Sequence, residues 1–239
     1  MRIWKDPKER SLLLLAVTSF FVLCIVEVRL PLISALHGTV LGILLKADAT
    51  QNTAIGLIIG VLSAYFFYLF IDFLPRVRKE NKTIEVLNSL IASVLDAYKR
   101  CRIFGHETAI SHVDKSVLNK VWLDEQVEIL KENKSNFLPL KFSMQTAHTR
   151  IEDFRHSLPL AVSLSPEHAM RWLIIVDKIR LLSESYGEQP SIPEDKIRFV
   201  DKDTDENPIK DYKSTLNLRF LEVVEQSRDW LYPEAKTDG

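Results

Sequence analysis

Residues 54–71 read AIGLIIGVLSAYFFYLFI and carry no charged side chain. A membrane-spanning helix needs about 20 mainly apolar residues, with a lower limit near 17. Within this run, Gly56, Gly60 and Ala64 recur at every fourth position, so they share one face of a helix. Small side chains let two helices approach closely in lipid. The sequence therefore predicts a spanning helix with a packing surface.

A second uncharged run, SLLLLAVTSFFVLCIV, occupies residues 11–26. It reaches spanning length if the helix continues to Arg29, with Glu27 and Arg29 extending their charged ends to the interface. The alternative is a secretory signal, because the charged start and short apolar core fit one. No cleavage site of small residues follows, so an uncleaved anchor over residues 11–29 is favoured.

Lysine and arginine gather on one side of both runs. Only Arg29 and Lys46 lie between the runs, whereas both outer flanks are basic. The positive-inside rule therefore places both termini in the cytoplasm, with the two spans forming a hairpin in the bacterial inner membrane. The predicted membrane-interface residues are Trp4, Tyr65, Tyr68, Arg76, Arg78, Lys79 and Lys82.

Residues 30–45, LPLISALHGTVLGILL, are too apolar for an ordinary loop and short for a full span. A third crossing would turn the basic residues 76–82 outward, against the positive-inside rule. A re-entrant or interfacial helix beginning near Pro31 fits better, and a long first helix kinked at Pro31 is the alternative. The small-residue pattern continues here, so the predicted helix-packing residues are Ser34, Gly38, Gly42, Gly56, Gly60 and Ala64.

From residue 80 onward the composition is that of a soluble protein, with apolar residues at helical spacing. This spacing predicts a helix over residues 84–98, which either runs on from the second span with a bend at Pro75 or is interrupted there. It predicts a second helix over 113–130. A shorter third helix, over 151–158, is expected to end near Pro159.

Ser165, Pro166 and Glu167 form the clearest helix start: an N-cap, a proline in the first turn and an acid at the positive end of the dipole. The predicted buried stripe of this helix is Met170, Leu173, Ile174, Leu181 and Leu182. A last helix is expected over residues 216–230. The polar stretch between these helices, residues 188–211, is predicted to be an irregular loop, with residues 197–200 as a candidate strand.

The residues from 80 to the end hold 22 Lys and Arg against 27 Asp and Glu, which argues against direct nucleic-acid binding. Residues 201–212 resemble a calcium loop but lack its glycine and its final carboxylate. His148, Glu152 and His156 share a helical face, but no fourth metal ligand stands at a telling spacing. No phosphate-binding glycine loop or nucleophile elbow is present. The sequence therefore predicts no catalytic residue, cofactor or metal, and no enzyme.

The predicted fold is all-α: a transmembrane hairpin within residues 1–79, followed by a cytoplasmic helical bundle over residues 80–239. In its layout, carried by residues 11–71, the chain resembles the two-span membrane effectors of bacterial anti-phage systems, including retron-associated effectors and SLATT-type pore-forming proteins. The resemblance implies a homo-oligomer that permeabilises the inner membrane when its cytoplasmic domain is triggered. It also implies a cytoplasmic protein partner, which for a retron is a reverse transcriptase with its DNA–RNA product.

The alternative function is a non-catalytic membrane tether or scaffold that recruits a cytoplasmic partner. An anchor needs hydrophobicity alone, whereas two small-residue faces and an apolar segment at residues 30–45 exceed that need, which favours the effector. Against the effector, the spans carry no charged side chain that would line an ion path. A pore would have to use hydroxyl groups, such as those of Thr18, Ser63 and Tyr68, or a hydrophobic gate.

Overall fold

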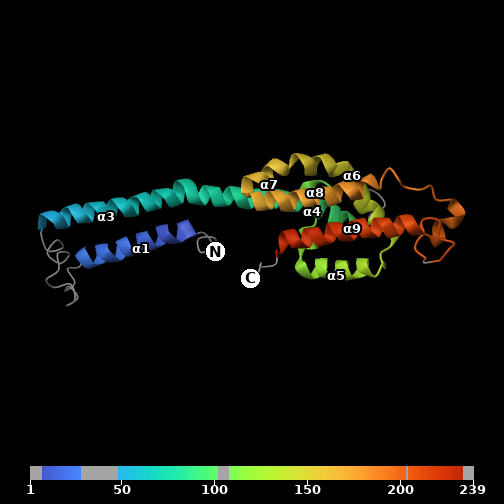
Figure 1. Ribbon diagram of the computed structural model, residues 1–239, viewed down its shortest axis with the longest axis horizontal. Helices are drawn as coiled ribbons and strands as arrows, with labels where there is room; N and C mark the ends of the chain where they lie inside the picture. The colour runs from blue at the N-terminus through green and yellow to red at the C-terminus, as the bar shows by residue number, and fades with distance from the viewer. Residues whose placement is uncertain (1–6, 28–47, 102–107, 203, 234–239) are drawn as a thin grey trace. The chain divides into compact units, whose positions relative to one another are not determined.

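The computed structural model describes residues 7–27, 48–101, 108–202 and 204–233, and the chain divides into two compact units, Met1–Lys79 and Glu80–Gly239. Every regular element among the described residues is a helix, which confirms the predicted all-α class (Figure 1). The predictions for residues 30–45, including Ser34, Gly38 and Gly42, and for Trp4, lie outside the described residues.

In the first unit, α1 (Pro7–Glu27) and α3 (Asp48–Tyr68) pack side by side in opposite directions (Figure 1). Both helices also carry large apolar side chains on their outer faces, and Leu14, Phe21, Leu57 and Phe67 are each more than half exposed. A helix that is apolar on all sides requires apolar surroundings. After α3 the chain passes through a π-helix, Leu69–Phe73, into α4 (Leu74–Arg100).

The second unit is built around the C-terminal half of α4, in which every residue from 89 to 97 is buried. Small side chains, among them Ser89, Ala92, Ser93 and Ala97, let neighbouring helices approach it from several sides. The other helices are α5 (Lys120–Lys131), α6 (Phe137–His156), α7 (Leu158–Leu164), α8 (Pro166–Glu184) and α9 (Lys210–Leu231). Helix α8 packs against α6, α7 and α9, and α5 packs against α9.

The helix predicted over residues 113–130 is broken in its first half. Two 3₁₀ helices, Ile110–His112 and Lys115–Leu118, precede α5. Asn119 Oδ1 accepts the backbone N–H of Val121 at 2.9 Å and caps α5. Short polar side chains of this kind compete with helical hydrogen bonds and favour helix starts, so the regular helix begins only after Asn119.

The third predicted helix is longer than expected, because α6 already begins at Phe137. Its predicted end near Pro159 is confirmed, since α6 ends at His156 and Pro159 lies in the first turn of α7. A proline is tolerated in a first turn because that backbone N–H has no partner within the helix. Pro139 occupies the same kind of position in α6. The candidate strand at residues 197–200 is wrong, because a 3₁₀ helix covers Glu194–Phe199.

Ser165 caps α8 as predicted, since its Oγ accepts the backbone N–H of His168 at 3.1 Å. The predicted buried stripe is wrong at three positions: Met170 is 62% exposed, and Leu173 and Ile174 are each 43% exposed. The buried side of the helix is instead formed by Trp172, Ile175, Ile179, Leu182 and Ser183. Trp172 has the largest side chain of the helix, and its burial removes the most apolar area from water.

Candidate functional site

Among the described residues, one helical run is long and apolar enough to cross a membrane, the 46-residue stretch Ile55–Arg100. Its apolar part is supplied by α3. In α1, Lys8, Glu9 and Arg10 occupy the first turn, and the uncharged residues 11–26 fall short of the minimum span of about 17 residues. The transmembrane hairpin therefore remains a prediction.

Gly56, Gly60 and Ala64 lie on an exposed face of α3, which we call the glycine face. A Cβ atom added to Gly56 or Gly60 would have no described atom within 4 Å. The packing of α1 on α3 therefore uses other residues of α3. The helix–helix contact predicted at the glycine face therefore stays a prediction. No described residue of this chain makes it, so its partner would have to come from elsewhere.

A polar junction ties α1 to the end of α3. Tyr68 Oη donates to Glu9 Oε1 at 2.5 Å, and Arg76 Nη2 donates to the same oxygen at 2.6 Å. Glu9 is 7% exposed, although it stands in the first turn of its helix. Arg76 Nη1 also lies 3.8 Å from Asp72 Oδ2. Hydrogen bonds to a charged acceptor are roughly twice as strong as neutral ones, so the junction holds these helix ends together.

The π-helix lies between Tyr68 and Arg76, where Pro75 would disturb an α-helix. Pro75 has no N–H to donate to the carbonyl of Ile71, and its ring would clash with that carbonyl in a regular helix. The wider turn avoids the clash, and the N–H of Leu74 donates to the carbonyl of Leu69. The helix therefore continues through Pro75, whereas the sequence left a bend or a break open.

The other predicted interface residues are spread along the same run. Tyr65 is half-buried in α3, and Arg78, Lys79 and Lys82 are exposed on α4. Sequence reasoning treated Tyr68 and Arg76 as separate interface residues and missed Glu9. The available signal was a single carboxylate between Lys8 and Arg10, directly before an uncharged run.

Among the residues that the structure describes, no group of three or more His, Cys, Asp or Glu side chains is placed to hold a metal ion. The ring of His148 stacks on Tyr186, with their centroids 4.3 Å apart, and Glu152 Oε1 accepts from Arg155 Nη1 at 2.6 Å.

Asp96 places a carboxyl group in the core of the second unit, where it is 0% exposed. Burial raises the pKa of Asp96, and the neighbouring guanidinium of Arg100 opposes that rise. Asp114 has the opposite surroundings. It is exposed, and hydrogen bonds from Lys99 and Ser116 lower its pKa to about 2.

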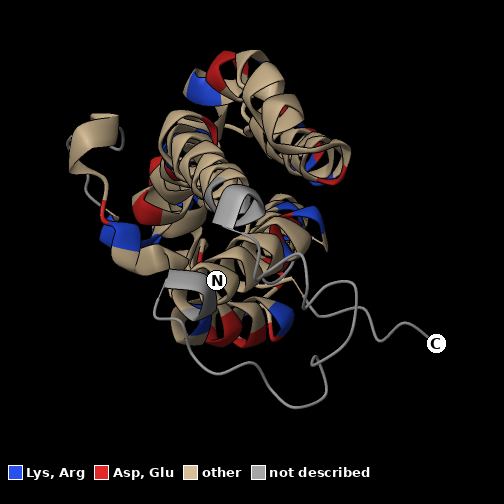
Figure 2. Ribbon diagram, turned by 90° about the vertical axis from the view of Figure 1, so that its left-hand side faces the viewer, with Lys and Arg blue, Asp and Glu red and all other residues tan. Residues whose placement is uncertain are grey.

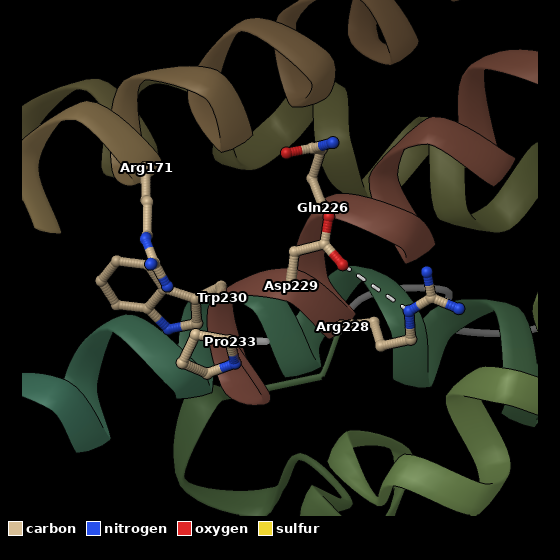
Figure 3. A pocket seen from close by; sticks show the side chains of 6 residues that line it. All are labelled: Arg171, Gln226, Arg228, Asp229, Trp230 and Pro233. Carbon is tan, nitrogen blue, oxygen red and sulfur yellow. Dashed lines mark ion pairs between the residues drawn. The ribbon is translucent and has the colours of Figure 1, made fainter. Parts of the chain in front are cut away.

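A pocket of about 480 Å³ opens between α8 and the end of α9 (Figure 3). Arg171 Nη2 pairs with Glu167 Oε1 at 2.7 Å, and Arg228 Nη1 lies 3.4 Å from Asp124 Oδ1. Each guanidinium of the pocket thus has a carboxylate partner within the chain. The residues that line the pocket are Arg171, Gln226, Arg228, Asp229, Trp230 and Pro233. Because both guanidinium groups are already paired, the pocket does not point to a particular class of ligand.

Beneath the pocket, aromatic rings join α6, α8 and α9. The centroids of Trp172 and Phe154 lie 5.7 Å apart, and those of Trp172 and Trp230 lie 5.4 Å apart. Trp230 Nε1 donates to Asn88 Oδ1 of α4 at 2.8 Å. The aromatic cluster is therefore structural, and it fixes Trp230 as one wall of the pocket.

Charged residues of both signs lie beside one another on the same helices, as the blue and red segments of Figure 2 show. Many of them form pairs one helical turn apart, such as Arg180 with Glu184 at 2.7 Å. The chain matches no protein-family model, and no curated protein or solved structure is detectably similar to it.

Proposed function

We propose that this chain is a membrane effector with both termini in the cytoplasm of a bacterium. In this proposal α1 and α3 cross the inner membrane as a hairpin, and copies of the chain associate through the glycine face. The assembly perturbs or permeabilises the membrane when the helical second unit is triggered by a cytoplasmic protein partner. The layout resembles anti-phage effectors, so the proposed role is antiviral defence, with a reverse transcriptase complex as the proposed partner.

The observation that carries the proposal is the open glycine face. A Cβ atom at Gly56 or Gly60 would meet nothing within 4 Å, so this face of an apolar helix has no described partner within the chain. In lipid, close packing at small residues is a main source of helix association. A contact between chains would use this face, whereas an anchor alone has no need of it.

The hydroxyl groups of the predicted spans favour a hydrophobic gate over a polar pore lining. Thr18 Oγ1 donates to the carbonyl of Leu14 at 2.8 Å, and Tyr68 Oη donates to Glu9. These hydroxyls are therefore already used in bonds within the chain. A hydrophobic constriction that opens by wetting needs no such groups.

The test replaces Gly56 and Gly60 together with Leu and follows membrane potential with a dye after induced expression. The double variant should stay in the membrane fraction and lose depolarisation, because the added side chains separate the packed backbones. The matched control is Ile59→Leu with Val61→Leu, which changes neighbouring exposed positions of the same helix and should keep full depolarisation.

A tether would give a different result. Neither the parent nor any variant would depolarise the membrane, and all would remain in the membrane fraction. If the Gly→Leu variant depolarises cells as strongly as the parent, the glycine face is not a functional contact, and the effector proposal loses its main support.

A further inference from the structure

The irregular segment between α8 and α9 is held to the rest of the second unit at few points. We call residues 189–202 the strap, which leaves the end of α8 and returns towards the start of α9 (Figure 1). None of its residues is buried, and residues 193–198 are all exposed. Its side chains of Ile192 and Val200 pack against the core but stay partly exposed. A segment with so little buried apolar area can open locally while the rest of its domain stays folded.

Several contacts of the strap lie within the strap itself. The backbone N–H of Lys196 donates to the carbonyl of Pro193 at 3.0 Å, and that of Lys202 donates to the carbonyl of Phe199 at 2.9 Å. The ring of Phe199 faces two cations of the strap, with its centroid 4.8 Å from Arg198 Cζ and 5.0 Å from Lys202 Nζ. Such contacts move with the strap, so they do not oppose its release from the helices.

Asp201 connects the strap to two helices. Its Oδ1 accepts the backbone N–H of Phe137, the first residue of α6, at 2.6 Å and lies 3.1 Å from Lys213 Nζ of α9. Asn136 is the N-cap residue of α6, but its side chain makes no capping hydrogen bond. The strap thus supplies the cap that α6 lacks locally, and negative charge is favoured at this end of a helix.

The two sides of this ion pair differ in their exposure to water. The side chain of Asp201 is 42% exposed, whereas that of Lys213 is 11% exposed. Opening of the strap would carry the carboxylate into water and leave the ammonium group in a site with little water. A buried charge without its partner is strongly destabilising. One carboxylate of the strap therefore accounts for much of the resistance to opening.

We propose that the strap is a movable element that opens and closes as one piece over the folded helices, with the Asp201 carboxylate as its latch. Opening releases the N–H of Phe137 and the ammonium group of Lys213 together, so it changes the starts of α6 and α9 in one step. The device belongs to the second unit alone, so it is independent of the membrane role.

Thiol labelling of the full chain in mild detergent tests the strap as one piece. Ile192→Cys reports strap opening, and Ser227→Cys, at a fully buried position of α9, reports unfolding of the helices; Cys24 and Cys101 are replaced by Ser in both. Ile192→Cys should react at least about 100-fold faster, and low urea should accelerate only Ser227→Cys, because local opening exposes little surface. Equal rates or equal urea dependence would overturn the proposal. So would labelling of Ile192→Cys as fast as that of Ile197→Cys, which is 55% exposed.

Asp201→Asn tests the latch. Labelling of Ile192→Cys should become at least about tenfold faster, because hydrogen bonds to a charged acceptor are lost. The matched control is Asp195→Asn, which removes the same charge from an exposed position of the strap. It should change the labelling rate by less than about twofold, as surface substitutions do. An equal effect of the two variants would overturn the proposal.

Lys213→Met tests the other side of the pair, because it removes the ammonium group and keeps an apolar side chain in the site. Labelling of Ile192→Cys should again become at least about tenfold faster. Combined with Asp201→Asn, the joint effect should be far smaller than the product of the two single effects, because both changes remove the same ion pair. A joint effect equal to that product would refute the latch. Circular dichroism of each variant checks that the helices remain folded.

Discussion

Glu9 shows how much one residue can organise in a short helix pair. Its carboxylate oxygen receives Tyr68 from the end of one helix and Arg76 from the start of another. The two bonds bridge 59 and 67 residues of sequence. Removing one donor would leave the buried Glu9 carboxylate with one hydrogen bond in place of two. The resulting loss of stability should exceed the stability that an exposed ion pair contributes.

Arg76→Ala should lower the stability of the first unit by about 1–3 kcal/mol, because the buried Glu9 carboxylate loses one of its two donors. Arg78→Ala is the matched control, because Arg78 is also exposed on the same helix but lies outside the junction. Unfolding of the full chain in mild detergent, with increasing amounts of a denaturing detergent, measures the difference. Equal loss in both variants would show that the junction does not hold α1.

The buried carboxyl group of Asp96 predicts the direction in which the stability of the second unit changes with pH. Burial raises its pKa above the ordinary value of 3.8, so its contribution to stability is complete below that value and is lost as pH rises through the folded pKa. Asp96→Asn removes this titration. The variant should therefore gain stability relative to the parent as pH rises above 3.8.

Asp114→Asn should respond in the opposite direction. Hydrogen bonds lower the pKa of Asp114 to about 2, so its contribution is present above the ordinary value and is lost as pH falls. Urea denaturation of residues 80–239, followed by circular dichroism, measures both differences. Asp96→Asn is compared with the parent as pH rises above 3.8, and Asp114→Asn is compared with it as pH falls from 3.8 towards about 2. If both variants gained stability relative to the parent in the same direction of pH change, the opposite pKa shifts of Asp96 and Asp114 would be contradicted.

At the scale of the element, the helix start with the clearest local signal was predicted correctly, whereas the buried face of the same helix was not. The Ser165 cap is a contact within four residues, so the sequence contains all of it. The buried residues Trp172, Ile175, Ile179 and Leu182 also follow helical spacing, so the sequence offers two apolar faces. Contacts with α6 and α9 decide which of them is buried. Pro159 was predicted only to mark the end of a helix, but it also lies in the first turn of the next helix, and a proline is compatible with both positions.

The two faces of α8 give a paired prediction. Trp172→Ala should reduce the free energy of unfolding by about 3–5 kcal/mol, as for other large core side chains. Leu173→Ala, one residue further on, should change it by less than about 0.5 kcal/mol, because that side chain lies on the surface. Urea denaturation of residues 80–239 measures both. A larger loss for Leu173→Ala than for Trp172→Ala would reverse the assignment of the core side.

For the whole molecule, the buried apolar cluster lies entirely within the second unit, between Leu87 and Trp230. Residues 80–239 expressed alone should therefore be soluble, with a strongly helical circular dichroism spectrum. An insoluble product would show that this core depends on the residues that precede it. The all-α class was predictable because helical spacing recurs along the chain, whereas the junction at Glu9 depends on distant partners.

The topology of the whole chain has a direct test. Alkaline phosphatase is active only outside the cytoplasm, so a fusion after Gly239 should be inactive and a fusion near Asp48 should be active. The expectation follows from the basic residues that flank both apolar runs. An active fusion after Gly239 would replace the hairpin with an odd number of crossings.

The π-helix at Leu69–Phe73 holds one extra residue in the turn before Pro75, because a π-turn contains one residue more than an α-turn. Deletion of Ile71 would close this turn to an ordinary α-turn and bring the proline ring against the carbonyl four residues earlier. The helix should then kink or break at the proline, one residue before Arg76. A single-codon deletion at this position would thus disturb the junction with Glu9, although it removes no residue of the junction.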